Sequence, residues 1–285
     1  MAASILNPFN VKHLAGLLWP ADPEMAVSPR WLMKRTRPLD DAFIKNAQVE
    51  SKASGEFRTV TVNGDAYVWP SGAEIRTLLT LVSELTNPGH PHHYLYGKTQ
   101  IDPGDVVLDI GACEGSFSAW AVRLGAEAIA VEPSNLMTRV IEALFELRGL
   151  PKPLIVKTLL GPEAKALHFT DNADNPGASR VTAQPEAGSY SVPVTTLDAM
   201  VEALDLKKLD FIKCDAEGAD VGILKSGRRT LEKFHPKIAI TTYHNEGDFL
   251  EIFAFLKGLD YKISGKGLLY TQRAFRPLML HAWHA

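Results

Sequence analysis

A glycine turn after an apolar run is the first place where this sequence could do chemistry. The run from Val106 to Ile110 is apolar apart from Asp109, and Gly111-Ala112-Cys113-Glu114-Gly115 follows it before a helix-length segment. Gly111 and Gly115 allow a tight turn and a close approach of the backbone to a ligand, and the N-terminus of the next helix offers unpaired N–H groups. This pattern predicts a nucleotide-like ligand at the turn.

A carboxylate ends the next apolar run. Glu132 follows Gly111 by about 20 residues, where a doubly wound sheet places its side chain beside the glycine turn. A carboxylate at that position can accept hydrogen bonds from both hydroxyls of a ribose. Asp109 could instead cap its turn. We assign the ligand site to the turn and to the residues around Glu132: Asp109, Gly111, Ala112, Glu114, Gly115, Glu132, Pro133 and Ser134.

Two carboxylates and a histidine follow later apolar runs. Asp215 and Glu217 come after residues 211–214, and His244 comes after residues 238–242. Neighbouring parallel strands bring such residues to one sheet edge, where ligands collect. His244 titrates near neutrality and suits a general base, and Asp215 could orient this histidine or the substrate. Asp215 or Glu217 could instead hold the loop by accepting backbone N–H bonds.

A divalent metal ion could do the same work as a histidine base. Asp215 and His244 would be two of its ligands, with Glu217 or Asp198 as a third. The sequence does not decide between the base and the ion.

From residue 101 onward, short apolar runs alternate with helix-length segments, which is typical of parallel βαβ units. A polar stretch at 170–191 interrupts the alternation and is predicted to be an irregular functional loop. Together with residues 90–96 it is expected to form a partly mobile lid. The expected strands are 106–110, 128–131, 154–160, 211–214, 238–242, 261–264 and 278–283, and the expected helices are 116–124, 134–148 (with Ser134 as its N-cap) and 248–256.

Residues 1–100 are interpreted as an N-terminal extension and residues 101–285 as the catalytic domain. The extension should hold a short amphipathic helix around residues 14–19, a β-hairpin at Asn63-Gly64, and a helix over 73–85 capped by Ser71 or Gly72. Three histidines at 90–93 have no cysteine or carboxylate near them in the sequence, so an ordinary loop is expected there instead of a metal cluster.

The composition narrows the class of partner. A formal charge of -3 lacks the positive field that binding to a nucleic-acid backbone requires, so a small molecule is expected instead. Two cysteines without framework spacing favour a reducing, cytoplasmic location. The sequence contains no run of roughly 18 apolar residues that could span a bilayer.

The stretch Lys213-Cys214-Asp215-Ala216-Glu217-Gly218, with the glycine turn and Glu132, resembles the FkbM family of methyltransferases. That family typically reads Lys-x-Asp-x-Glu-Gly at the fourth strand. The resemblance covers residues 100–285, with Cys113 where the family often has Asn and Asp220 where Glu is frequent. Supporting pieces are Thr196-Leu197-Asp198, Gly227, Tyr243-His244 and Asp248.

The resemblance implies an α/β, class I methyltransferase (Rossmann-like) fold, a doubly wound, mostly parallel sheet with a last antiparallel strand. It also implies S-adenosylmethionine as the methyl donor and a hydroxyl acceptor on a sugar or secondary metabolite. Removing the hydroxyl proton would fall to Asp215, Glu217 and His244. A nucleotide-dependent oxidoreductase is one alternative, although Cys113 and Ser116 stand where a dinucleotide fingerprint needs glycine. A catalytically silent binding module on the same fold is the other.

Overall fold

The computed structural model describes residues 27–28, 30–31, 34, 36–176, 179–270 and 275–284. The helix expected around residues 14–19 lies outside the described residues. Within them, every helix is too short or too polar to cross a membrane. The cytoplasmic location stays a prediction.

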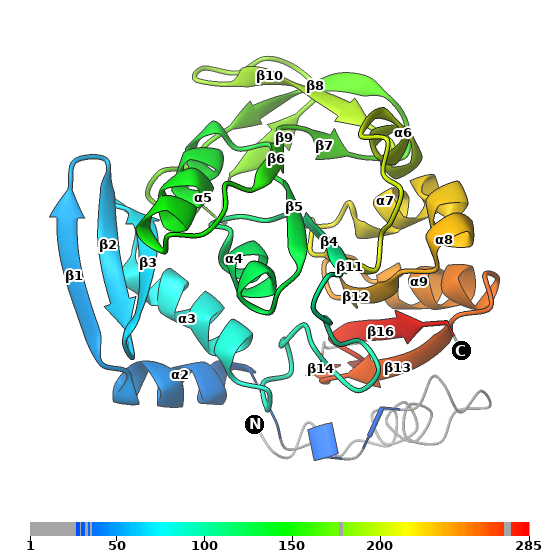
Figure 1. Cartoon of the computed structure of the whole chain (residues 1–285), viewed down its shortest axis with the longest axis horizontal. Helices are drawn as coiled ribbons and strands as arrows, with labels where there is room; N and C mark the ends of the chain where they lie inside the picture. Colours follow the sequence, from blue (N-terminus) through cyan, green and yellow to red (C-terminus); the bar gives the residue numbers. More distant parts are fainter. Residues whose placement is uncertain are drawn as a thin grey trace.

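A seven-stranded sheet forms the centre of the molecule (Figure 1). All neighbouring strands are parallel except β16, which lies antiparallel between β12 and β13. The predicted fold class, a doubly wound, mostly parallel sheet with a last antiparallel strand, is thereby confirmed. In spatial order the strands are β13 (Lys262–Lys266), β16 (Met279–Trp283), β12 (Lys237–Thr241), β11 (Phe211–Cys214), β4 (Val106–Ile110), β5 (Glu127–Val131) and β6 (Leu154–Val156).

Helices cover both faces of this sheet because the strands are apolar on both sides. In β4, Leu108 and Ile110 pack into the cluster formed with α6 (Leu197–Ala203), α7 (Asp220–Ser226), α8 (Arg228–Phe234) and α9 (Asp248–Lys257). Val107, the residue before Leu108, faces the other side, where α4 (Ser116–Arg123) packs, and Ala130 of β5 meets α5 (Asn135–Leu147) on that side. The alternation along each strand therefore builds the two halves of the core.

The N-terminal segment carries a three-stranded antiparallel sheet of β1 (Val49–Ser54), β2 (Phe57–Val62) and β3 (Asp65–Pro70), flanked by α2 (Thr36–Asn46) and α3 (Ile75–Thr86). The predicted hairpin is confirmed, with Asn63 and Gly64 both at positive φ between β2 and β3. The predicted cap of α3 is wrong. Its N-cap is Glu74, and Ser71 instead donates its hydroxyl to the carbonyl of Gly55 in the β1–β2 turn.

The N-terminal sheet packs directly on the catalytic fold. Val68 of β3 lies in the apolar cluster of α5, and Arg148 Nε donates to the carbonyl oxygen of Ala66 at 2.8 Å. The division of the chain at residue 100 stays a prediction.

A second sheet includes part of the stretch expected to be irregular at 170–191, so that prediction is wrong for Thr170, residues 180–182 and residues 190–191. It has the order β7 (Leu159–Leu160), β10 (Tyr190–Thr195), β8 (Lys165–Thr170) and β9 (Arg180–Thr182). The single strand predicted over 154–160 is also wrong, since residues 154–156 join the central sheet and 159–160 pair with β10. Thr158 makes the break by donating its hydroxyl to the carbonyl of Pro193. The predicted lid motion stays a prediction.

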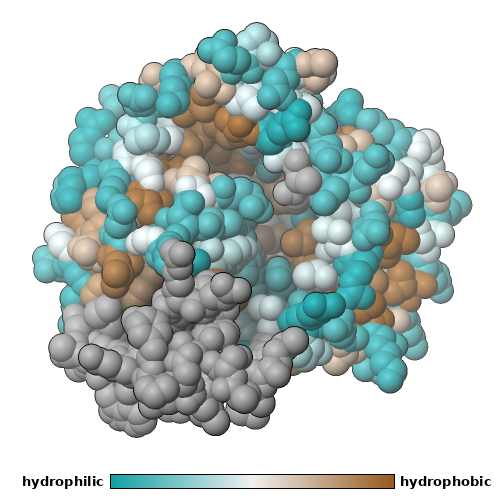
Figure 2. Space-filling model, turned by 180° about the vertical axis from the view of Figure 1, so that it is seen from behind, coloured by the Kyte–Doolittle hydropathy of each residue, from teal (hydrophilic) through white to brown (hydrophobic). Residues whose placement is uncertain are grey.

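Two further features complete the outline of the chain. A short ribbon of β14 (Leu269–Tyr270) and β15 (Phe275–Arg276) precedes β16. Seen from behind, the molecule is hollowed near its middle, with many hydrophilic side chains around the hollow (Figure 2).

Candidate active site

The glycine turn begins where β4 ends. The backbone N–H groups of Gly111 and Ala112 both donate to the carbonyl of Val131 at the end of β5, at 3.1 and 3.2 Å. Gly111 has φ +72°, and a Cβ atom there would lie 2.0 Å from the carbonyl oxygen of Asp215. This glycine is therefore required for the turn to touch the segment after β11. Gly115, at φ +77°, lies equally close to α5, because a Cβ atom there would be 2.8 Å from the side chain of Ile141.

Asp109 pairs with Lys213, the first residue of the family motif, to which the sequence assigned no role. Lys213 Nζ lies 3.0 Å from Asp109 Oδ1 and donates to the carbonyl of Gly111 at 2.6 Å. Burial acts to lower the pKa of Lys213, but Asp109 and Asp215 raise it above its ordinary value, so the ammonium stays charged. Asp109 is fully buried and also accepts the Ser118 hydroxyl at 2.7 Å. These contacts favour a role for Asp109 in supporting the turn.

Glu132 lies beside the turn, as its position in the sequence predicts. One carboxylate oxygen accepts the N–H of Cys113 at 2.8 Å, and the other accepts the N–H of Ser134 at 2.9 Å. Cys113 has a positive φ, a conformation uncommon for a non-glycine residue, and it points its N–H at this carboxylate. Burial raises the pKa of Glu132 to about 7, against the lowering effect of the two N–H bonds.

The rest of the predicted ligand site surrounds Glu132. Ala112 and Glu114 are buried in the turn, Pro133 is half-buried, and Ser134 caps α5 by accepting the N–H of Met137. Burial also raises the pKa of Glu114.

Two residues without a role in the sequence prediction reach this place, Tyr190 from β10 and Asp171 from just after β8. The hydroxyl of Ser134 donates to Asp171, and Tyr190 donates to the same carboxylate at 3.0 Å. Only the fold brings them here, since both lie in the stretch expected to be irregular.

The hydrogen-bonding capacity of Glu132 suits a nucleoside ligand at the glycine turn. Each of its carboxylate oxygens accepts one N–H and has a further lone pair for a hydroxyl donor. A buried carboxylate is costly to charge, and two ribose hydroxyls would supply the hydrogen bonds that favour its charged form. Glu132, Gly111 and Gly115 are thus the residues that would hold S-adenosylmethionine, beside the N-terminus of α4.

At the neighbouring strand ends, Asp215, Glu217 and His244 come together as expected. His244 Nε2 lies 3.5 Å from Asp215 Oδ1 and 3.6 Å from Glu217 Oε2. Asp215 Oδ2 accepts the hydroxyl of Tyr94 at 2.7 Å. Burial acts to lower the pKa of His244, but the surrounding carboxylates raise it above its ordinary value.

Asp220, and not Asp215, pairs with His244 Nδ1 and orients this histidine, whereas the other role expected of Asp215, to orient the substrate, stays a prediction. Asp220 Oδ2 lies 3.0 Å from His244 Nδ1. Asp220 also accepts the N–H groups of Ala216 and Gly218, so it holds the loop in place, the role considered for Asp215 and Glu217. As the first residue of α7, Asp220 turns its side chain back toward this loop. The Glu217 carboxylate is largely exposed.

The segment with the three histidines, residues 90–93 (the histidine loop), also contributes to this site through His92. His92 Nε2 lies 3.1 Å from the Tyr243 hydroxyl and 3.6 Å from Asp215 Oδ2, and its Nδ1 lies 3.3 Å from Glu84 Oε2. Burial acts to lower the pKa of His92, but Glu84 and Asp215 raise it.

Carboxylates lie closer to this loop than the sequence indicates, because α2 and α3 bring Asp40 and Glu84 to His90. His90 Nδ1 accepts the N–H of His92, so the proton of the neutral ring lies on Nε2, which faces Asp40 at 3.2 Å. That nitrogen then has no lone pair for a metal ion. The expectation of an ordinary loop at this segment stays a prediction.

A pocket of about 350 Å³ opens over Asp215, Glu217 and Tyr243. Its base is formed by residues of the sheet edge and the histidine loop, and its wall by α3. The lining residues are Glu74, Arg76, Thr77, Thr80, Leu81, Glu84, His92, Asp215, Glu217 and Tyr243. The N-terminal extension thus helps to shape the site, which no local sequence pattern indicates.

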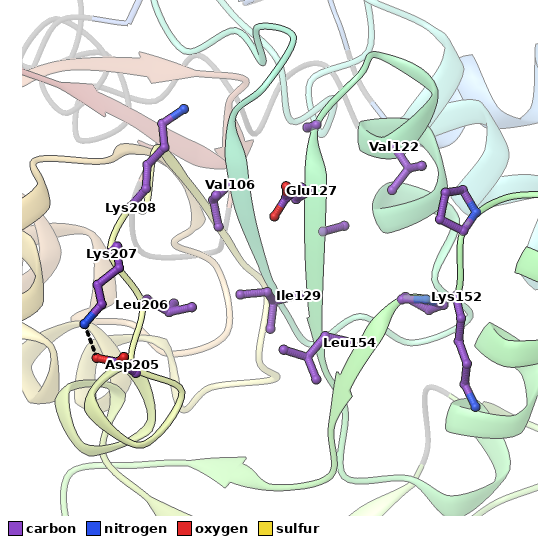
Figure 3. Close-up of a pocket in the computed structure, with 14 residues that line it drawn as sticks. Val106, Val122, Glu127, Ile129, Lys152, Leu154, Asp205, Leu206, Lys207 and Lys208 are labelled. Atoms are coloured by element: carbon purple, nitrogen blue, oxygen red, sulfur yellow. Dashed lines mark hydrogen bonds and ion pairs between the residues drawn. The ribbon is translucent and has the colours of Figure 1, made fainter.

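Another pocket, of about 600 Å³, opens where β4 and β5 begin, at the opposite edge of the sheet (Figure 3). Apolar side chains such as Val106, Ile129 and Leu154 form its base, and Lys207 pairs with Asp205 at its rim. Ligands of open α/β sheets bind at the carboxyl ends of the strands, so we place the active site at the smaller pocket.

The order of the central sheet, with its antiparallel β16, defines a class I methyltransferase fold. The model of the methyltransferase FkbM domain matches residues 109–263, and the chain belongs to this family, which uses S-adenosylmethionine as its methyl donor. A comparison with curated proteins finds no match.

Several solved structures are similar to the chain. An FkbM methyltransferase from Methylobacillus flagellatus KT is 17% identical, with a TM-score of 0.49 over 94% of this chain and 64% of that one. The precorrin-6Y C5,15-methyltransferase of Geobacter metallireducens GS-15 is 18% identical, with a TM-score of 0.40 over 65% of this chain and 83% of that one. Magnesium protoporphyrin IX methyltransferase of Synechocystis, solved with bound SAM, is 14% identical, with a TM-score of 0.37 over 64% and 71%.

Proposed function

We propose that the chain transfers a methyl group from S-adenosylmethionine to a hydroxyl oxygen of a small molecule, a sugar or a secondary metabolite. The observation that carries this proposal is the buried His244 Nε2 beside two carboxylates, at the same sheet edge as Glu132 and the glycine turn. When bound, the donor supplies the methyl carbon, whose bond to sulfur breaks as its bond to the acceptor oxygen forms.

The residues of the pocket have two tasks in this reaction. Asp215, Glu217 and Tyr243 line the place where an acceptor would be aligned with the donor site. His244 Nε2, held by Asp220 through the other ring nitrogen, would help the hydroxyl lose its proton. An alcohol needs such help more than an amine does, because its neutral oxygen is a poor nucleophile and its hydroxyl is a very weak acid. The carboxylates around the pocket also support a small-molecule acceptor over a nucleic acid.

The experiment that tests the proposal combines donor binding with a search for the acceptor. S-adenosylhomocysteine should bind with roughly micromolar affinity or better in calorimetry. Mass spectrometry of a panel of sugars and polyketide alcohols incubated with the donor should then reveal a gain of one methyl group. Absence of binding heat at two temperatures would refute the methyltransferase proposal. Methylation at nitrogen alone would refute the oxygen acceptor.

Glu132→Gln should weaken the binding of S-adenosylhomocysteine by about 1.5–3 kcal/mol, because the amide loses the charge that strengthens hydrogen bonds to the ribose. Calorimetry measures this change. Glu127→Gln, an exposed carboxylate at the start of the same strand, is the matched control and should leave the affinity unchanged. Equal affinities in all three proteins would remove Glu132 from the donor site.

The affinity for S-adenosylhomocysteine should also depend on pH through Glu132. Its pKa of about 7 means that the carboxyl is mostly protonated at pH 6 and mostly charged at pH 8. Ribose hydroxyls favour the charged form, so binding should strengthen as pH rises, by up to about tenfold over this range. Calorimetry at both pH values checks this. Glu132→Gln should flatten the profile, and a profile that this substitution leaves intact would assign the titration to another group.

A further inference from the structure

The His244 side chain presents a lone pair to two carboxylates. Asp220 Oδ2 lies 3.0 Å from Nδ1 and accepts its proton in a hydrogen bond, which leaves Nε2 without a proton in the neutral ring. Nε2 is buried and forms no hydrogen bond with any residue that the structure describes. The side chain as a whole is only 9% exposed. A nitrogen lone pair is thus aimed at Asp215 and Glu217.

One oxygen of each carboxylate faces this place, and that of Asp215 (Oδ1) also accepts the Thr241 hydroxyl at 3.3 Å. Tyr94 holds Asp215 Oδ2 at 2.7 Å, so that Oδ1 faces His244 Nε2 at 3.5 Å. Glu217 Oε2 approaches the same nitrogen at 3.6 Å. Asp215, Asp220 and His244 have ligand atoms that all lie within 4.8 Å of one another, but Asp220 is already engaged by two backbone N–H groups and by His244 Nδ1.

Distances of this size are too long for a hydrogen bond, but they suit two ligands of one metal ion. Ligand atoms about 2.1 Å from an ion in tetrahedral geometry lie about 3.4–3.6 Å from each other. Two carboxylates and a lone pair also repel one another unless a cation lies between them. In metal sites the second nitrogen of a histidine ligand commonly donates to a carboxylate, which is the position of Asp220 here.

We propose that His244 Nε2, Asp215 Oδ1 and Glu217 Oε2 bind a divalent transition-metal ion such as Mn²⁺ or Zn²⁺, with Asp220 fixing the histidine. One imidazole nitrogen and two carboxylate oxygens suit these ions better than Mg²⁺ or Ca²⁺, which prefer oxygen ligands alone. The pocket borders Asp215 and Glu217, so an acceptor oxygen can reach the open coordination positions.

The role of the ion rests on the proposed function. A cation beside the acceptor hydroxyl lowers the pKa of that hydroxyl, so its proton leaves more readily to water in the pocket. His244 Nε2 then helps the hydroxyl lose its proton through the ion that it binds.

The test measures ion binding on the whole chain without any acceptor. Protein treated with EDTA and dialysed is titrated with Mn²⁺ and with Zn²⁺ by calorimetry, and metal content is measured after gel filtration. We expect one ion per chain with a Kd in the micromolar range or tighter. Glu217→Gln and His244→Asn should each weaken binding by at least about tenfold. Glu217 is exposed, so its variant should fold normally even if His244→Asn is unstable.

Matched controls are Glu251→Gln, an exposed carboxylate on α9, and His235→Asn, an exposed histidine after α8. Both should bind the ion as the wild type does. No ion bound, or an affinity that Glu217→Gln and His244→Asn leave unchanged, overturns the metal site. Binding of S-adenosylhomocysteine is measured on the same samples. Donor binding without ion binding refutes only the metal site, whereas ion binding without donor binding refutes the methyltransferase proposal.

Discussion

His244→Asn should lower turnover of the acceptor by about a hundredfold or more while the affinity for S-adenosylhomocysteine stays nearly unchanged. The asparagine amide can still donate to Asp220 in place of His244 Nδ1, so the loop around Asp220 keeps its hydrogen bonds. What the variant lacks is Nε2, the atom that lies beside Asp215 and Glu217. Whether this nitrogen accepts a proton or binds an ion, the hydroxyl loses the group that helps it ionise.

The measurement is single-turnover methylation of the acceptor found by mass spectrometry, with donor affinity from calorimetry. His235→Asn removes the same ring from an exposed position and should keep full turnover. A His244→Asn enzyme with wild-type turnover would take His244 out of the chemistry. An equal loss of donor affinity and turnover would mean that the substitution damages the whole edge of the sheet.

The sequence predicts the central sheet well because its strands are short apolar runs bounded by clear signals. Val106 to Ile110 and Phe211 to Cys214 are buried along almost their whole length, so composition alone marks them. Ser134 caps its helix as expected because the cap needs only the N–H of Met137, three residues away. The second sheet escaped prediction since its strands are half-exposed and polar, as in Lys165–Thr170, and carry no strong pattern.

The site residues also fall into two groups, those whose place follows from local sequence spacing and those placed by packing between distant segments. Glu132 and the glycine turn could be placed from the sequence because a βαβ unit fixes their spacing. Tyr94, Glu84 and His92 could not, since they reach the pocket through the packing of α3 and its loop against the sheet. Asp220 was noticed only as a departure from the family, yet it is the partner of His244.

Gly111→Ala should destabilise the protein by at least about 3 kcal/mol and abolish measurable binding of S-adenosylhomocysteine. The alanine Cβ would lie 2.0 Å from the carbonyl oxygen of Asp215, a backbone atom that cannot turn aside as a side chain could. Either the turn or the segment after β11 must move, and each carries part of the site. The positive φ adds a cost of about 1 kcal/mol.

Gly149→Ala separates these two costs. Gly149 has φ +61°, close to the +72° of Gly111, but among the described residues no atom lies within 4 Å of its added Cβ. Gly149→Ala should therefore lower the free energy of unfolding only by the cost of the positive φ, about 1 kcal/mol, and should bind S-adenosylhomocysteine normally. Urea unfolding gives both free energies of unfolding. If Gly111→Ala lowers the free energy of unfolding by no more than Gly149→Ala does, the turn can accommodate a Cβ atom beside the Asp215 carbonyl. Glycine would then be needed at position 111 only for its positive φ.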